Sequence, residues 1–288
     1  LQNSQWMYLN GVILVSPADY KQYRTSQPIY SALNLPYFTA ASWYQKALTS
    51  DLQQKDLLEI LPEAETFAIE SLMPALAKGG FITDSEKQVV AKKMAYYSGL
   101  SEEVILQSNL DVSTSYFWKE LLRDKGLTIG RLDSRYLGID RQETGTRPDY
   151  SAELTSWLHS FTPAINYYLR EHLNYKTDIK YNMFGPVHPW DRSDNNTGEN
   201  LRQAMAQNPY LNVMIQSGYY DGATTYYNAK YTLWHIDPSG RMQDRLSFKG
   251  YRSGHMMYLR REDLEKSNED IRQFIANTLP GAGVPAKY

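Results

Sequence analysis

The sequence predicts an α/β fold in which a central, mostly parallel sheet is interrupted by a long, mainly helical insertion. Two short apolar runs rich in β-branched residues, 12–15 and 211–215, predict strands that are buried on both faces. The segment between them instead shows helical spacing and helix-capping signals. We therefore expect a parallel-sheet core whose strands are separated in sequence by helices.

The end of the chain adds a third strand and a helix. Residues 246–248, before Gly250, are a weaker strand candidate, and residues 262–279 carry apolar side chains at helical spacing up to a break at Pro280. Three strands are too few for a doubly wound sheet with both faces covered. Because the first run has the apolar character of a central strand, we expect that N-terminal strands of the sheet are absent from this chain.

Local signals mark the helices of the insertion. Residues 63–77 have a helical pattern, with Pro74 as an expected kink and Gly79 as its stop. Thr83 is expected to cap the next helix, and residues 185–200, rich in Pro, Gly, Asn and Asp, predict a loop. Further helices are predicted over residues 101–107, 113–123 and 152–172.

Composition excludes several classes of function. The 30 basic and 32 acidic residues leave a net charge of −2 and form no basic block, so we expect no nucleic-acid partner. The absence of cysteine excludes disulfides and thiolate metal sites. Because no run of about 18 apolar residues occurs, we expect no membrane span. The chain opens without a methionine or a signal peptide and soon enters a strand, so we expect a further segment before Leu1.

An aspartate follows the second predicted strand directly. Asp221 lies in the stretch 217–222, Ser-Gly-Tyr-Tyr-Asp-Gly, and catalytic groups in open α/β sheets lie just beyond the carboxyl ends of strands. A carboxylate at that place can orient a histidine. On position alone, an N-cap for a helix over residues 224–233 is an equally good role for Asp221.

A histidine follows the third predicted strand in the same way. His255 lies on a glycine-containing loop before the terminal helix, where a histidine taken alone is more often structural than catalytic. Asp221 and His255, 34 residues apart, match the Ser…Asp…His chain order of α/β-hydrolases. In that arrangement the aspartate fixes the imidazole tautomer, and the imidazole takes the proton of the serine.

The nucleophile and any cofactor motif are missing from this chain. No G-x-S-x-G elbow occurs, and Ser253, within the histidine loop, is interpreted as a turn residue. No P-loop, dinucleotide fingerprint or H-E-x-x-H is present, so we expect no metal and no cofactor. The four other histidines do not have metal-ligand spacing: His159, His172, His188 and His235.

Several segments resemble the bacterial branch of the serine carboxypeptidase family. Residues 208–211 and 217–221 look like its catalytic-aspartate segment, and residues 253–258 are similar to its G-H-M histidine segment. The opening, residues 8–17, looks like the strand that follows the nucleophile helix, and the likeness continues at residues 223–224, 231–233 and His235.

The resemblance implies an α/β-hydrolase with a helical cap, divided into a core strand over 1–20, a cap over 21–207 and a core over 208–288. It implies a secreted or periplasmic enzyme that removes C-terminal residues from peptides through an acyl-enzyme, without a metal or a cofactor. Asp221 and His255 carry over as two members of the triad, whereas the serine belongs upstream. The missing N-terminal part would complete the site, so this chain alone is expected to be inactive.

The resemblance leaves alternatives open. Gly222 and Thr225 depart from the family's usual residues after the aspartate, and Met257 with Tyr258 replaces the Val-Pro of eukaryotic members. An acyltransferase or esterase of the same fold is a second hypothesis. A noncatalytic binding protein that lacks the serine is a third, although such a protein would have less reason to keep Asp221 and His255.

Overall fold

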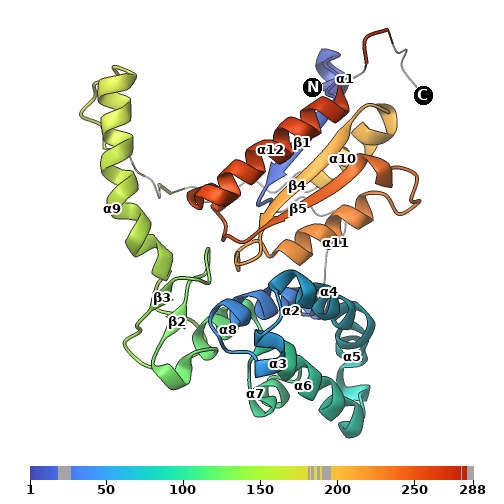
Figure 1. Ribbon diagram of the computed structural model, residues 1–288, viewed down its shortest axis with the longest axis vertical. Coiled ribbons are helices and arrows are strands. Elements are labelled where there is room, and N and C mark those ends of the chain that lie inside the picture. The colour runs from blue at the N-terminus through green and yellow to red at the C-terminus, as the bar shows by residue number, and fades with distance from the viewer. Residues whose placement is uncertain are drawn as a thin grey trace.

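The computed structural model describes residues 1–18, 27–180, 182, 185–186, 189, 196–279 and 281–283. The predicted boundary between core and insertion at residue 20, part of the predicted loop over 185–200, and Pro280 lie outside the described residues. Within the described part the chain is a mixed α/β protein with a parallel sheet at one end and a helical bundle at the other (Figure 1).

The sheet has three parallel strands in the order β1-β4-β5. These are β1 (Gly11–Val15), β4 (Asn212–Gly218) and β5 (Leu246–Tyr251), so all three predicted strands are confirmed. β4 and β5 each extend three residues beyond the apolar runs, because the parallel ladder continues to the pair Gly218 and Tyr251.

The first strand, predicted to be central in a sheet with further N-terminal strands, lies at the edge of the sheet that the described residues form. β4 occupies the centre, and β1 pairs with β4 alone in this sheet. The side chains of β1 are only partly buried, and Val15 is 46% exposed. An apolar run reports how hydrophobic a strand is, but the number of its neighbours depends on pairing that the run does not encode.

Helices cover both faces of the sheet (Figure 1). Side chains alternate along β4, so Val213 and Ile215 pack with Met205 of α10 (Thr197–Gln207) and with α11 (Tyr226–Ile236). On the other face lies α12 (Arg261–Thr278), the terminal helix that the sequence predicts. α10 therefore belongs structurally to the sheet, although its residues fall within the range 21–207 assigned to the insertion.

The helical bundle surrounds α2 (Gln27–Tyr44), which contacts α4, α5, α6 and α11. Phe38 of α2 is fully buried and stacks on Phe117 with ring centroids 4.0 Å apart. The remaining helical elements of the bundle are α3 (Ser50–Gln53), α4 (Leu57–Phe67), η1 (Ala68–Leu72), α5 (Met73–Lys78), η2 (Gly79–Phe81), α6 (Asp84–Ser98), α7 (Glu102–Gln107), α8 (Thr114–Glu120) and η3 (Arg123–Lys125).

Capping explains where several of these helices begin. Thr83 forms the predicted capping box with Glu86, and a second capping box at Asp56 starts α4 six residues before the predicted residue 63. The helix continues through the π-helical segment η1 to Lys78, with Pro74, the expected kink, in the first turn of α5, and Gly79 ends it with a φ of 53°. The next two predicted helices are confirmed, with Ser101 and Ser113 as their N-caps, and the second ends at Glu120, before the predicted residue 123.

A small extension leaves the bundle on the left of Figure 1. The two-residue strands β2 (Thr128–Ile129) and β3 (Leu137–Gly138) pair antiparallel, and neither is predicted from the sequence. α9 (Ala152–Tyr167), prolonged by the π-helical η4 (Tyr168–His172), confirms the predicted helix over 152–172. Outside η4, α9 packs mainly against β3.

Tyrosines of α11 join the sheet to the bundle. The hydroxyl of Tyr226 donates to the side chain of Glu65 in α4, and the hydroxyl of Tyr227 donates to its carbonyl. Lys230 pairs with the carboxylate of Glu65 at 2.6 Å.

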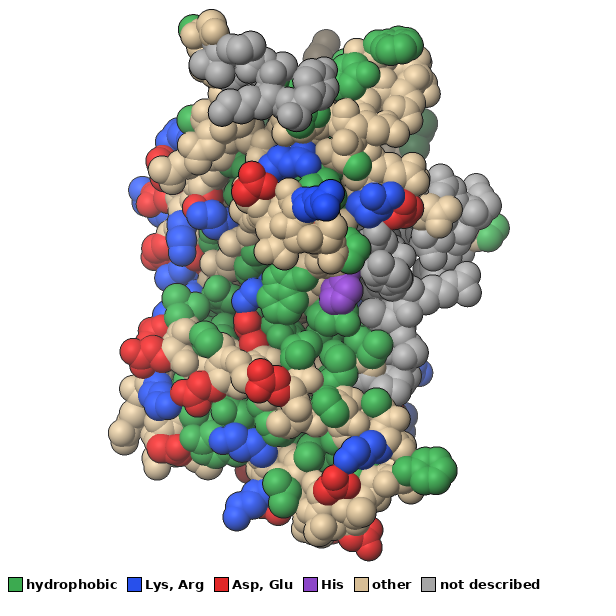
Figure 2. All heavy atoms as spheres, turned by 90° about the vertical axis from the view of Figure 1, so that its right-hand side faces the viewer, with side chains coloured by type: hydrophobic (Ala, Val, Ile, Leu, Met, Phe, Trp, Pro, Cys, Tyr) green, Lys and Arg blue, Asp and Glu red, His purple; other side chains and the backbone are tan. Residues whose placement is uncertain are grey.

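Figure 2 shows hydrophobic side chains gathered across the middle of one face, with charged side chains above and below. α1 (Gln2–Gln5) precedes β1, and no helix in the described ranges is long and apolar enough to cross a membrane.

Phe38 provides a test of the bundle core. Truncation to Ala removes the stack on Phe117 and leaves a cavity, so Phe38→Ala should lower the free energy of unfolding by about 3–5 kcal/mol in urea titrations. Phe81→Ala is the matched control, because Phe81 is 95% exposed and its loss should change stability by less than about 0.5 kcal/mol. Equal effects of the two substitutions would contradict the assigned core.

Candidate active site

Asp221 is held by the turn that follows β4. Its side chain is fully buried, and Oδ1 accepts the backbone N–H groups of Ala223 at 2.9 Å and Thr224 at 3.0 Å. Oδ2 accepts the hydroxyl of Thr224 at 2.6 Å. Asp221 is not the N-cap of the next helix, because α11 begins at Tyr226 and its N-cap residue is Thr225. The cap role for Asp221 is therefore wrong.

His255 completes the pair. Its Nδ1 lies 2.8 Å from Oδ2 of Asp221, and its side chain is 34% exposed whereas that of Asp221 is 0% exposed. A carboxylate only accepts hydrogen bonds, so the geometry requires a proton on Nδ1. In the neutral ring Nε2 then carries the lone pair, which is the arrangement that a general base needs.

The surroundings raise the pKa of His255 above its ordinary value of 6.5. The hydrogen bond to Asp221 is the main cause, and the negative charge of Asp221 acts in the same direction. Partial burial and the cation of Arg131 act against this rise. The protonated ring that forms when a general base takes a proton is therefore stabilised by Asp221.

Two distant segments fix the backbone of His255. Its N–H donates to the carbonyl of Leu132 at 2.7 Å, and its own carbonyl accepts the hydroxyl of Ser16 at 2.8 Å. Ser16 follows β1 directly, has a φ of 44°, and donates its N–H to Gln216 of β4. A positive φ is uncommon for serine. The hydrogen bonds of Ser16 to Gln216 and to His255 hold it in this conformation at the end of β1.

Glycines let the aspartate turn and the histidine loop approach each other. The N–H of Tyr220 donates to the carbonyl of Ser253 at 3.0 Å. A Cβ on Gly218 would lie 2.2 Å from the carbonyl oxygens of both Ser253 and Gly254, and a Cβ on Gly254 would lie 2.5 Å from the side chain of Asp133. The two loops can therefore be this close only without a side chain at Gly218, and the histidine loop can approach Asp133 of the insertion only without one at Gly254.

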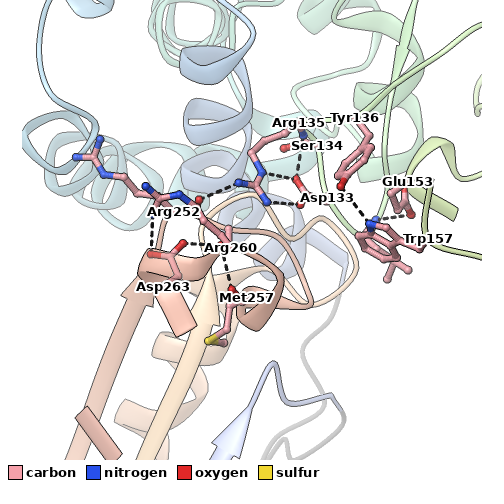
Figure 3. Close-up of polar contacts among 12 residues, drawn as sticks. Asp133, Ser134, Arg135, Tyr136, Glu153, Trp157, Arg252, Met257, Arg260 and Asp263 are labelled. Atoms are coloured by element: carbon pink, nitrogen blue, oxygen red, sulfur yellow. Dashed lines mark hydrogen bonds and ion pairs between the residues drawn. The ribbon is translucent and has the colours of Figure 1, made fainter. Parts of the chain in front are cut away.

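The network in Figure 3 anchors the histidine loop from both sides. Arg135 binds both carboxylate oxygens of Asp133, at 2.8 and 2.6 Å, and also donates to the carbonyl of Arg252. On the other side, buried Ser253 donates to Asp263, which also pairs with Arg260. Ser253 is therefore engaged in holding the loop, in agreement with its interpretation as a turn residue.

Within the described ranges, no serine hydroxyl forms a hydrogen bond to the ring of His255, and no three acidic or histidine side chains are grouped to hold a metal ion. His159 and His235 each hydrogen-bond a carbonyl of their own helix, and His172 stacks on Tyr168. His188 lies outside the described residues. Among the described residues, the candidate site therefore consists of the imidazole of His255 and the carboxylate that orients it.

Four contributors to this site are not predicted from the sequence. Ser16 and Thr224 fall within the resembling segments 8–17 and 223–224 without a predicted role, yet Ser16 binds His255 and Thr224 binds Asp221. The sequence does carry a signal for Ser16, because it directly follows a strand parallel to β4 and therefore lies at the same end of the sheet. No sequence signal marks the carbonyl of Leu132 or the charge of Arg131, since both reach the site from the helical insertion.

Comparisons with known proteins find no matching family model, no matching curated protein and no matching solved structure.

Gly218 tests the close approach of the two loops. In Gly218→Ala the new methyl group meets two backbone carbonyls that cannot rotate away, so stability should fall by about 3 kcal/mol in thermal or urea unfolding. Gly80→Ala is the control, because a Cβ there meets nothing within 4 Å. A stable Gly218→Ala protein would show that the loops are farther apart than described.

The charge of Asp221 should be visible in the titration of His255. By NMR, the pKa of His255 should lie above 6.5 and should fall in Asp221→Asn, because partial burial and Arg131 then act unopposed. Since the folded pKa is raised, protonated His255 adds stability below its unfolded pKa of about 6.5, and this contribution is lost as the pH rises through the folded pKa. An unchanged titration in Asp221→Asn would exclude the pairing.

Proposed function

We propose that Asp221 and His255 are the aspartate and histidine of a Ser-His-Asp triad on an α/β-hydrolase fold. The observation that carries this proposal is the 2.8 Å hydrogen bond between a fully buried carboxylate and a partly exposed imidazole, beyond the carboxyl ends of two adjacent parallel strands. Asp221 comes first in the chain and His255 second, which is the order of that fold.

In this proposal His255 transfers one proton in each half of the reaction. Nε2 takes the proton of a serine hydroxyl while the serine oxygen attacks the carbonyl carbon of the last peptide bond. The proton then passes to the departing amine nitrogen, and the acyl-enzyme ester remains. Water, deprotonated by the same Nε2, hydrolyses the ester and returns the proton to the serine.

The serine belongs to a segment outside this chain, which we propose adds strands to the sheet beside β1. The partly buried apolar side chains of β1 and its single strand partner are compatible with such an addition. The resemblance of residues 208–221 and 253–258 to serine carboxypeptidases favours a carboxypeptidase over an acyltransferase or esterase. The same resemblance supports a secreted or periplasmic location and a peptide substrate.

Substitution of His255 tests the proposal. The protein expressed from its complete reading frame should release the C-terminal residue of an N-blocked dipeptide, and His255→Gln should reduce turnover by at least about a thousandfold with an unchanged far-UV spectrum. His159→Gln is the matched control, because His159 is exposed and its ring hydrogen-bonds the carbonyl of Thr155 in its own helix.

A fluorophosphonate probe adds an independent readout, since it labels only an activated serine. It should label the complete protein and leave the 288-residue chain unlabelled. Labelling of this chain at Ser16 or any other serine would place the nucleophile here and overturn the proposed division. A complete protein that neither labels nor hydrolyses would favour the noncatalytic binding protein.

A further inference from the structure

The turn between β2 and β3, residues 130–136, contacts both loops of the candidate site. The carbonyl of Arg131 accepts the N–H of Gly222 in the aspartate turn at 3.0 Å. The next carbonyl along the chain, that of Leu132, accepts the N–H of His255 at 2.7 Å. Because consecutive residues of one turn bind the two loops, the position of this turn determines how the two loops face each other.

The β2–β3 turn has a second attachment to each loop. The N–H of Ser134 donates to the carbonyl of Tyr220 in the aspartate turn at 3.0 Å. The guanidinium of Arg135 donates to the carbonyl of Arg252 in the histidine loop at 3.2 Å. The aspartate turn and the histidine loop are therefore joined through the β2–β3 turn as well as directly to each other.

Glu153 supports this turn from α9. It lies in the first turn of that helix and is fully buried, and its Oε1 accepts the N–H of Leu132 at 3.0 Å. Leu132 thus binds Glu153 through its N–H and His255 through its carbonyl oxygen. A Cβ on Gly130 would collide with Oε2 of Glu153, so the carboxyl group can lie this close to the turn only because residue 130 is a glycine.

The link from Glu153 to Leu132 does not require a charge. Among the described residues, Oε2 of Glu153 has no hydrogen-bond partner. Burial raises the pKa of Glu153, whereas the N–H of Leu132 and the cation of Arg131 act against this rise. Protonation of Oε2 leaves Oε1 able to accept the N–H of Leu132. An uncharged side chain with a carbonyl oxygen at the same place can therefore make the same hydrogen bond.

We infer that Glu153 is a positioning residue for His255, which it holds against Asp221 through Leu132. Without an acceptor at residue 153, the N–H of Leu132 loses its partner and the β2–β3 turn can shift. The shift would lengthen the 2.8 Å hydrogen bond between His255 and Asp221. A displacement of about 1 Å can lower a reaction rate about a hundredfold. The effect on rate rests on the proposed hydrolytic function, whereas the effect on the hydrogen bond does not.

Two substitutions separate the hydrogen bond of Glu153 from its charge. Glu153→Leu removes the acceptor at similar volume, and Glu153→Gln removes only the charge. In the complete protein, Glu153→Leu should lower kcat on an N-blocked dipeptide about tenfold or more, with KM changed by less than about twofold, because the base transfers a proton without binding the substrate. Glu153→Gln should keep kcat within about twofold of the unaltered protein.

The pKa of His255, measured by NMR in the same proteins, gives a readout without turnover. The hydrogen bond to Asp221 is the main cause of the raised pKa of His255, so the pKa should fall in Glu153→Leu and stay in Glu153→Gln. Trp157→Phe is the matched control, because it removes the 3.2 Å hydrogen bond from α9 to Tyr136 and leaves the acceptor for Leu132 in place. This variant should keep both kcat and the pKa of His255.

Three results overturn the positioning role. The first is an unchanged kcat and an unchanged pKa of His255 in Glu153→Leu. The second is an equal loss in Glu153→Gln, which would make the charge responsible, and the third is an equal loss in Trp157→Phe, which would indicate a general loosening of α9. If Glu153→Leu does not fold, Glu153→Asp replaces it with the same expected decreases, because the acceptor is then withdrawn by one methylene.

The two hypotheses fail in different ways. Hydrolysis that requires His255 but is unchanged in Glu153→Leu overturns the positioning role and leaves the proposed function standing. A pKa of His255 that falls in Glu153→Leu and stays in Glu153→Gln, in a complete protein without any hydrolysis, supports the positioning role and overturns the proposed function.

Discussion

The hydrogen bond from His255 to buried Asp221 is the interaction around which the rest of the site is arranged. An isolated carboxylate without access to water is costly, and it is tolerated here because the backbone N–H groups of Ala223 and Thr224, the hydroxyl of Thr224 and the imidazole all donate to it. The parallel pairing of β4 with β5 brings the two loops to one edge of the sheet. The glycines then allow the distance that the hydrogen bond requires.

The insertion contributes to the site as well as covering it. The carbonyl of Leu132 holds the backbone of His255, and Arg135 ties the histidine loop to Asp133. The bundle is in turn joined to the sheet through Glu65 and the tyrosines of α11. Displacement of the insertion would therefore disturb the orientation of His255. At this site the stability of the helical part and that of the sheet depend on each other.

Much of this arrangement could be predicted from local sequence signals. Apolar runs predicted all three strands, and Ser or Thr caps with Glu three residues later predicted helix starts such as that at Thr83. Asp221 and His255 were found because each directly follows a strand. The edge position of β1, the β2–β3 pair and the support from Leu132 could not be predicted in this way, because pairing and backbone contacts between distant segments leave no pattern in neighbouring residues.

The partly exposed β1 has a consequence for how this chain behaves in solution. In the described sheet, one row of its backbone N–H and C=O groups has no strand partner, and Gly11–Val15 contains neither a charge nor a proline to discourage pairing. Such an edge is a template onto which a strand from another molecule can add. An open β1 edge therefore favours association between molecules, and a strand that adds to β1 would remove this tendency.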